Sequence, residues 1–360
     1  MTWSTRFTKK FPARLPIMGA PMANHVSALM AYEVCRAGGL GLLAAGHLQE
    51  VTSIEKDIEE FRKDDIHPLS IGFICFSTFG SPEGWKRFEF ILDKHRPAVV
   101  QFFAPAVVAH DKQKAMTNIK MAHKYNAKVL CQVGSIKEAR MALDAGADSI
   151  IVQGSEAGGH GLRRELGNGT LPFASTAVSI VRSEYDPDTP VLAAGGIMDG
   201  RSLVAALALG CDGVVLGTRL WATSESKGQA SVKQRLVEVE SCDEIIRTPV
   251  FDAIQNSYSS TPWPYPFDSI GAVHNDFSRQ WDLQPPENLI AAIHSSDSVV
   301  VQEYKDAVEH GNPDIGVVHA GQGVGLVKAL QSTFDVIDAI NAEALSILHG
   351  LPKMVLRHDR

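Results

Sequence analysis

The sequence predicts an α/β protein, a (β/α)₈ TIM barrel with an added, mostly helical and irregular lobe. Three observations predict this fold. Apolar strand-like runs alternate with amphipathic stretches from Leu15 to about Trp221, eight such runs can be counted, and the regularity ends after Trp221. Eight strands with crossover helices favour a closed barrel over a doubly wound sheet. A length of 360 residues fits one barrel plus an accessory segment better than two domains.

The eight expected strands are short apolar runs, and the stretches between them have the period of helices. Ile136, Ala139 and Leu143, for example, share one helical face, and Gly146 ends that helix. The expected strands cover residues 15–20, 40–45, 69–73, 98–103, 128–132, 149–153, 191–194 and 213–216.

Beyond Trp221 the chain is expected to form an accessory lobe on the substrate side. The segment 261–267 is rich in proline and aromatic residues, so packing rather than a repeating ladder must order it, as a lobe or lid. An amphipathic helix is expected from about 324 to 348. We therefore assign residues 1–222 and about 316–360 to the barrel, and about 223–315 to the lobe.

The composition indicates a soluble globular protein that acts on small molecules. It is 45% hydrophobic and 21% charged, with a net charge of -7 and no long basic run, so no nucleic-acid partner is expected. No apolar run reaches the roughly 18 residues of a membrane helix. The five cysteines lack CxxC spacing, which favours a reducing compartment, predicts a cytoplasmic location and gives no sign of a metal site. The composition is compatible with a homodimer.

Glycine loops after the seventh and eighth strands predict a phosphate site. Gly195 and Gly196 follow one strand, and Gly217 and Thr218 follow the next. Glycine lets backbone N–H groups approach a phosphate closely, and a following helix N-terminus adds favourable partial charge. Either loop alone could be an ordinary tight turn. Two such loops at consecutive strand ends favour phosphate, because barrels commonly bind it there.

A third glycine-rich segment, residues 153–161, follows the sixth strand and carries His160. A histidine on a loop at this face can act as an acid or base near neutral pH. The alternative is a loop histidine that is bonded to backbone. Gln153 offers an amide for hydrogen bonds to a ligand, or it merely caps its strand.

Two further segments are ambiguous when taken alone. Ala20, Pro21 and Met22 after the first strand read as a plain turn. Residues 316–325, with Gly321 and Gln322, imitate a dinucleotide fingerprint but show GxGxG instead of GxGxxG, so we reject a Rossmann site there. Three other histidines have no partner at metal-ligand spacing, and surface or core positions are expected for His25, His47 and His319.

Together, the segments around residues 19–22, 153–161, 194–197, 217–219 and 320–325 resemble the nitronate monooxygenase family, formerly called 2-nitropropane dioxygenases. The resemblance spans about residues 15–335, and its most specific part is 153–160. It implies an FMN-dependent barrel in which His160 is the catalytic base. It also implies contacts to FMN from Ala20, Pro21, Met22, Gln153, Gly158, Gly159, Gly195, Gly196, Gly217, Thr218, Gly321 and Gln322.

One departure from the family is visible. Many bacterial relatives carry Asn after the Gly-Phe of the third strand, whereas here Gly72 and Phe73 are followed by Ile74 and Cys75. This change puts one expected polar contact to the flavin or substrate in doubt.

The resemblance implies that an alkyl nitronate, or a nitroalkane, is oxidised with O₂ to a carbonyl compound with release of nitrite. His160 would either take the α-proton of a nitroalkane or steady the anionic nitro group. Three alternatives stay open. They are a flavin-dependent enoyl-ACP reductase that uses NAD(P)H; IMP dehydrogenase, disfavoured because no cysteine lies in the loop after the sixth strand; and a barrel that binds FMN or a sugar phosphate without catalysis.

Overall fold

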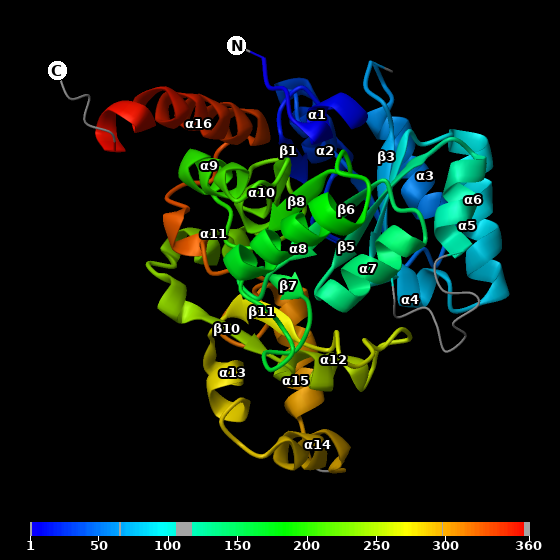
Figure 1. Ribbon diagram of the computed structural model, residues 1–360. Coiled ribbons are helices and arrows are strands. Elements are labelled where there is room, and N and C mark those ends of the chain that lie inside the picture. Colours follow the sequence, from blue (N-terminus) through cyan, green and yellow to red (C-terminus); the bar gives the residue numbers. More distant parts are fainter. Residues whose placement is uncertain (1, 65, 106–116, 297, 356–360) are drawn as a thin grey trace.

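The computed structural model describes residues 2–64, 66–105, 117–296 and 298–355. Its main body is a sheet of eight parallel strands that curls into a barrel with helices around it (Figure 1). The strand order is β1-β9-β8-β6-β5-β4-β3-β2. The strands are β1 (Ile17–Gly19), β2 (Leu43–Gly46), β3 (Ser70–Ile74), β4 (Val99–Phe103), β5 (Lys128–Val133), β6 (Ser149–Gln153), β8 (Val191–Ala194) and β9 (Gly213–Leu216). The predicted fold class is confirmed, and each of the eight expected runs overlaps one strand.

The second strand begins later than expected, because Leu40, the first residue of the expected run, pairs with β1 instead of with β3. Leu40 bridges Met18 of β1, with its N–H donating to Ile17 O at 2.9 Å and its C=O accepting from Gly19 N at 2.9 Å. These bonds bring the segment before β2 against β1, at the two ends of the strand order. The regular ladder with β3 begins only at Leu43.

Helices follow the strands as the amphipathic pattern predicted. They pack their apolar faces on the outside of the sheet, for example α7 with Ala139 and Leu143 buried. These helices are α2 (Ala28–Ala37), α3 (Val51–Phe61), α4 (Cys75–Thr78), α5 (Pro82–His95), α6 (Thr117–Lys124), α7 (Ile136–Asp144), α8 (Thr170–Glu184), α9 (Gly200–Ala208) and α10 (Thr218–Trp221).

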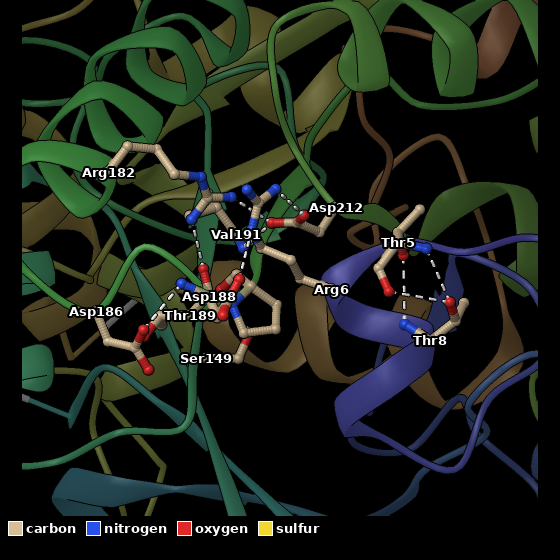
Figure 2. A network of polar contacts seen from close by, with 11 residues as sticks. Thr5, Arg6, Thr8, Ser149, Arg182, Asp186, Asp188, Thr189, Val191 and Asp212 are labelled. Carbon is tan, nitrogen blue, oxygen red and sulfur yellow. Dashed lines mark hydrogen bonds and ion pairs between the residues drawn. The ribbon is translucent and has the colours of Figure 1, made fainter.

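The amino end of the barrel is closed by the short helix α1 (Arg6–Lys10). Phe7 and Phe11 are buried with side chains of the barrel interior, such as Met18 and Leu192. Beside them, Asp212 accepts hydrogen bonds from Arg6 at 3.2 Å, from Arg182 at 2.6 Å and from the backbone N–H of Val191 at 3.0 Å (Figure 2). This end of the barrel is therefore packed for stability, and the opposite end is free for a site.

The lobe lies below the barrel in Figure 1 and contains a small antiparallel sheet. Strand β11 (Ile270–Val273) pairs with β10 (Ile245–Thr248) on one side and with β7 (Gly159–His160) on the other. The strand β7 comes from the loop between β6 and α8, so the lobe holds part of a barrel loop. The lobe helices are α11 (Ala230–Glu238), α12 (Val250–Asn256), α13 (Asp276–Trp281), α14 (Pro286–His294) and α15 (Val300–His310).

The C-terminal helix was placed too early by the sequence pattern. Residues Val324–Leu326 form a 3₁₀ turn, and the helix α16 spans Thr333–Val355. Its first turn is held by side chains: Ser332 Oγ accepts from Asp335 N at 3.1 Å, and Glu225 accepts from Thr333 N at 2.9 Å. A Cβ at Gly325 would lie 2.7 Å from the carbonyl oxygen of Glu240, so the backbones pack closely where the helix was expected.

Candidate functional site

A cavity of about 680 Å³ lies at the carboxyl ends of the barrel strands, between the strand loops and the lobe. Nearly every residue singled out in the sequence lines it. These residues are Ala20, Pro21, Met22, Gln153, Gly158, Gly159, His160, Gly195, Gly196, Gly217, Thr218 and Gly321. Gln322 does not line the cavity: its side chain is exposed, and its backbone N–H donates to Glu156 O at 2.9 Å.

The glycine segments meet because their backbones approach too closely for any side chain. A Cβ at Gly158 would lie 2.5 Å from the carbonyl carbon of Ala320, and one at Gly321 would lie 2.6 Å from Glu156 O. The Gly321 N–H donates to Thr218 Oγ1 at 3.0 Å. Four segments far apart in the sequence therefore form one cradle, since a Cβ at Gly195 would also lie 3.0 Å from Ala157 N.

The cradle has the features that a phosphate needs. Within the described residues, the N–H groups of Gly196, Gly217 and Thr218 donate to no protein atom. A Cβ at Gly217 would have no neighbour closer than 3.9 Å, so the space in front of this backbone is open. Free donors around an open space fit a phosphate group at this point.

Contrary to expectation, the N-terminus of α9, the helix after the seventh strand of the sequence analysis, does not contribute to the phosphate site. Asp199 caps α9, accepting from Ser202 N at 2.9 Å in a capping box. Glu343 accepts from Gly200 N at 2.7 Å. Two carboxylates thus already satisfy this helix end, and the donors left for an anion belong to the glycine loops.

His160 is fixed from three sides. Its backbone pairs with Ile270 in the small sheet, and its carbonyl accepts from Gln153 Nε2 at 2.9 Å. Its ring stacks on Trp263 with a centroid separation of 3.6 Å and an interplanar angle of 13°. The Pro- and aromatic-rich segment therefore orders the histidine, and Gln153 is engaged with the protein instead of capping its strand.

Asp252 of α12 is a buried partner of His160 that the sequence did not reveal. Its Oδ1 lies 2.8 Å from His160 Nε2, and its side chain is 1% exposed. Burial raises the pKa of Asp252, and the adjacent His160 opposes that shift. The Oδ2 atom has no hydrogen-bond partner among the described residues, so the carboxyl group is devoted to the imidazole.

Arg247 holds the loop that carries His160. Its guanidinium donates to the carbonyls of Ala157 at 2.5 Å, Ser155 at 3.3 Å, Gly159 at 3.4 Å and Ser269 at 3.1 Å. Burial lowers the pKa of Arg247 to about 10, which still leaves it protonated at neutral pH. This side chain replaces the ladder hydrogen bonds that an irregular loop lacks.

Three histidines expected at the surface or in the core instead line the cavity: His25, His47 and His319. Burial lowers the pKa of His25 to about 4 and that of His319 well below its ordinary value. The His319 ring lies 5.3 Å from that of His25 and 6.3 Å from that of His160, centroid to centroid. Single histidines carry no spacing signal, so no motif predicted that these three rings would lie close together.

A row of glutamines follows three adjacent strands. Gln101 lies in the middle of β4, Gln132 is the penultimate residue of β5 and Gln153 is the last residue of β6, and all three line the cavity. Gln101 donates to Gln132 Oε1 at 3.1 Å, while its own Oε1 is buried without a partner in the described chain. Ile74 also lines the cavity, so an apolar side chain stands at the position where the resemblance led us to expect Asn. These amides suit the polar edge of a planar ring.

Other classes of site find no support in the described parts of the chain. No group of three or more His, Cys, Asp or Glu there is arranged to hold a metal ion. No helix of the described residues is long and apolar enough to cross a bilayer.

Comparison with known proteins identifies one family model and several relatives of similar length. The sequence model of the family described as nitronate monooxygenase matches residues 4–343. A nitronate monooxygenase of Neurospora crassa is 28% identical, over 91% of this chain and 88% of that protein. A dehydrogenase of a hydroxy-methyl-oxo-octahydroindene carboxyl-CoA from Rhodococcus jostii is 27% identical, over 97% and 98% of the two chains. The solved structure of FabK from Thermotoga maritima has a TM-score of 0.76 and 26% identity, and the match covers 98% of this chain and 100% of that one.

Proposed function

The chain belongs to the nitronate monooxygenase family and is a flavin-dependent oxidoreductase, and on that premise we propose that it binds FMN and oxidises alkyl nitronates, and nitroalkanes, with O₂ to carbonyl compounds and nitrite. The observation that carries the proposal is the Asp252–His160 pair at 2.8 Å, facing the cavity that the glycine cradle bounds. A buried acid–base pair beside a phosphate cradle suits proton abstraction next to a bound cofactor.

FMN is preferred as the flavin because the cradle offers donors for one phosphate at the end of the cavity. Gly195, Gly196, Gly217 and Thr218 would hold that phosphate. Gly158, Gly159 and Gly321, with Ala20, Pro21 and Met22, would lie against the rest of the cofactor. Gln153 contributes through the backbone of His160, to which it is bonded. When bound, FMN supplies the redox chemistry that side chains cannot.

His160 would act as the base. With Asp252 ionised, the 2.8 Å contact places the imidazole proton on Nε2, so Nδ1 is left as the acceptor for a substrate proton. Stacking on Trp263 keeps the ring plane fixed, so the proton is taken in one direction. After the substrate proton has moved to His160, the carboxylate of Asp252 stabilises the imidazolium by a charge-assisted hydrogen bond.

The assignment is tested by reconstituting the protein with FMN and measuring oxygen uptake and nitrite release on nitroalkanes and on their preformed nitronates. We expect His160→Asn to suppress turnover of neutral nitroalkanes by at least roughly a hundredfold, while turnover of nitronates falls far less. An equal loss on both substrates would remove the role in proton abstraction. A protein that stays colourless after FMN is added would refute the flavin assignment itself.

The match to FabK and the full-length match to a dehydrogenase make reduction by NAD(P)H a second candidate. Anaerobic mixing with NADPH distinguishes the two functions. Rapid bleaching of the flavin colour would favour a reductase, and slow or no bleaching favours the oxidation of nitronates.

A further inference from the structure

The phosphate cradle offers hydrogen-bond donors but no positive charge of its own. Among the described residues that line the cavity, none is Lys or Arg. A phosphate monoester carries about 1.5 to 2 negative charges near neutral pH. Neutral N–H groups offset only part of the free energy that such an anion loses when it leaves water. A cation close to the cradle, without lining the cavity, would offset the rest.

Arg219 carries such a cation next to the cradle. It directly follows Gly217 and Thr218, in the short helix α10, and its side chain does not line the cavity. The residue is 9% exposed, which is low for an arginine. A guanidinium is charged at every pH at which the protein is folded. A buried positive charge therefore lies beside the two residues on which we place the phosphate.

The guanidinium has no anionic partner within the chain. Arg219 Nη2 donates to the amide oxygen of Gln331, and Nη1 is buried without a hydrogen-bond partner among the described residues. Burial lowers the pKa of Arg219, and no carboxylate opposes that shift. A buried cation without an anion is unfavourable, because it has lost its hydration and no opposite charge replaces it.

Other buried or partly buried cations of this chain are satisfied by the protein itself. Lys233 Nζ donates to the carbonyl oxygens of Thr223 at 2.8 Å and Ser226 at 3.1 Å. Arg182 pairs with Asp212 at 2.6 Å, and Arg247 donates to four carbonyl oxygens. Arg219 differs from them, so the partner of its charge is expected to come from outside the chain.

We propose that this partner is the phosphate of the flavin, and that Arg219 makes the cradle selective for a phosphorylated flavin. The identity of the ligand rests on the proposed function. The need for an anion does not, because it follows from the unpaired guanidinium. Arg219 would act through the protein interior instead of by contact, and charges there are screened less than in water. Such an attraction corresponds to roughly a tenfold change in affinity.

The affinities of FMN and riboflavin test the proposal, since the two flavins differ only in the phosphate. Arg219→Met keeps an apolar stem and removes the charge. We expect it to lower the preference for FMN over riboflavin roughly tenfold, with the affinity for riboflavin unchanged, as measured by quenching of flavin fluorescence. Arg219→Lys keeps the charge and should keep most of the preference. Equal losses in both variants, or for both flavins, would indicate a structural role and overturn the proposal.

The stability of the flavin-free protein gives a second readout, of opposite sign. Removal of an unpaired buried charge should raise the midpoint of thermal unfolding of Arg219→Met by about 2 °C or more. Arg182→Met is a matched control at the amino end of the barrel. It breaks the contact with Asp212, so its midpoint should fall while its preference for FMN stays unchanged. A lower midpoint in Arg219→Met would show that the guanidinium is already satisfied, and would refute the proposal. Arg219→Gln serves the same purpose if the Met variant does not fold.

Inorganic phosphate separates this proposal from the proposed function. Phosphate should raise the midpoint of the unmodified flavin-free protein above that in chloride of equal ionic strength, and it should have no such effect on Arg219→Met. If FMN does not bind but this difference persists, the FMN assignment fails and the anionic partner of Arg219 stands. If FMN binds with a preference over riboflavin that Arg219→Met leaves unchanged, the cofactor assignment stands and the role of Arg219 is refuted.

Discussion

Gly217→Ala is the most direct test of the phosphate cradle. Gly217 has φ −102° and ψ −90°, so it is not in the left-handed region that favours glycine, and an added Cβ would have no neighbour nearer than 3.9 Å. We therefore expect the free energy of unfolding of the flavin-free protein to change by less than about 0.5 kcal/mol. The methyl group would project into the space before the N–H groups of Gly217 and Thr218, where we place the FMN phosphate.

The expected loss of FMN binding free energy is that of one hydrogen bond to a charged acceptor, about 1.5–3 kcal/mol. This loss would raise the dissociation constant for FMN roughly 10- to 150-fold. Titration with quenching of flavin fluorescence measures it. Riboflavin lacks the phosphate, so its affinity should stay within about twofold of the unmodified protein. Equal losses for FMN and riboflavin, or no loss for FMN, would refute the placement of the phosphate.

Gly146→Ala provides a matched control for the same exchange. Gly146 follows α7, has φ +94° and has open space around its Cβ position, and it does not line the cavity. A side chain in this left-handed region costs about 1–2 kcal/mol of stability. We expect that loss in chemical unfolding, with an unchanged dissociation constant for FMN.

Three further predictions concern the pair, the buried histidines and the barrel end. Asp252→Asn should lower kcat/KM on neutral nitroalkanes roughly 10- to 100-fold and barely change it on nitronates, because the amide no longer stabilises the imidazolium; equal effects in steady-state assays would contradict the pairing. His25 has its pKa lowered from 6.5 to about 4, so between these pH values the unfolded chain holds a proton that the folded chain lacks, and stability falls as pH falls. In His25→Phe this slope, measured by urea unfolding, should be shallower by up to about 1.4 kcal/mol per pH unit, and an unchanged slope would show that His25 is protonated when folded. Asp212→Ala should cost about 3–5 kcal/mol of stability by leaving buried donors unpaired, without affecting the affinity for FMN, as thermal unfolding and flavin titration would show.

The sequence was sufficient for the barrel because each strand and each helix has its own local pattern. Strands β6, β8 and β9 begin and end at the predicted residues. The turn signals on both sides of a short apolar run determine where the strand can begin and end. The helix α16 was misplaced because residues 324–326 share its apolar periodicity, and only the close packing of Gly325 on Glu240 breaks it. The predicted division between barrel and lobe stays a prediction.

The site was predictable only where glycine marks it. Gly158, Gly195 and Gly321 occupy positions where two backbones approach too closely for a side chain. A glycine can be recognised in the sequence, so it indicates such a close approach. Asp252 and Trp263 carry no such mark. They lie 92 and 103 positions after His160 and act through single contacts that only the folded lobe creates.

The strand pairing that joins the lobe to His160 explains how such a distant pair is specified. His160 pairs with Ile270 and Gly159 with Gly271, and a slip of one residue would turn the imidazole to the opposite face, away from Asp252. A Cβ at Gly271 would lie 2.4 Å from Ala157 O, so this position of β11 accepts glycine alone against the loop. An isolated glycine within an apolar strand indicates a close approach of backbones. The register of Gly271 therefore sets the contact between His160 and Asp252, and the residue in the sequence that indicates this contact is the glycine, not the aspartate.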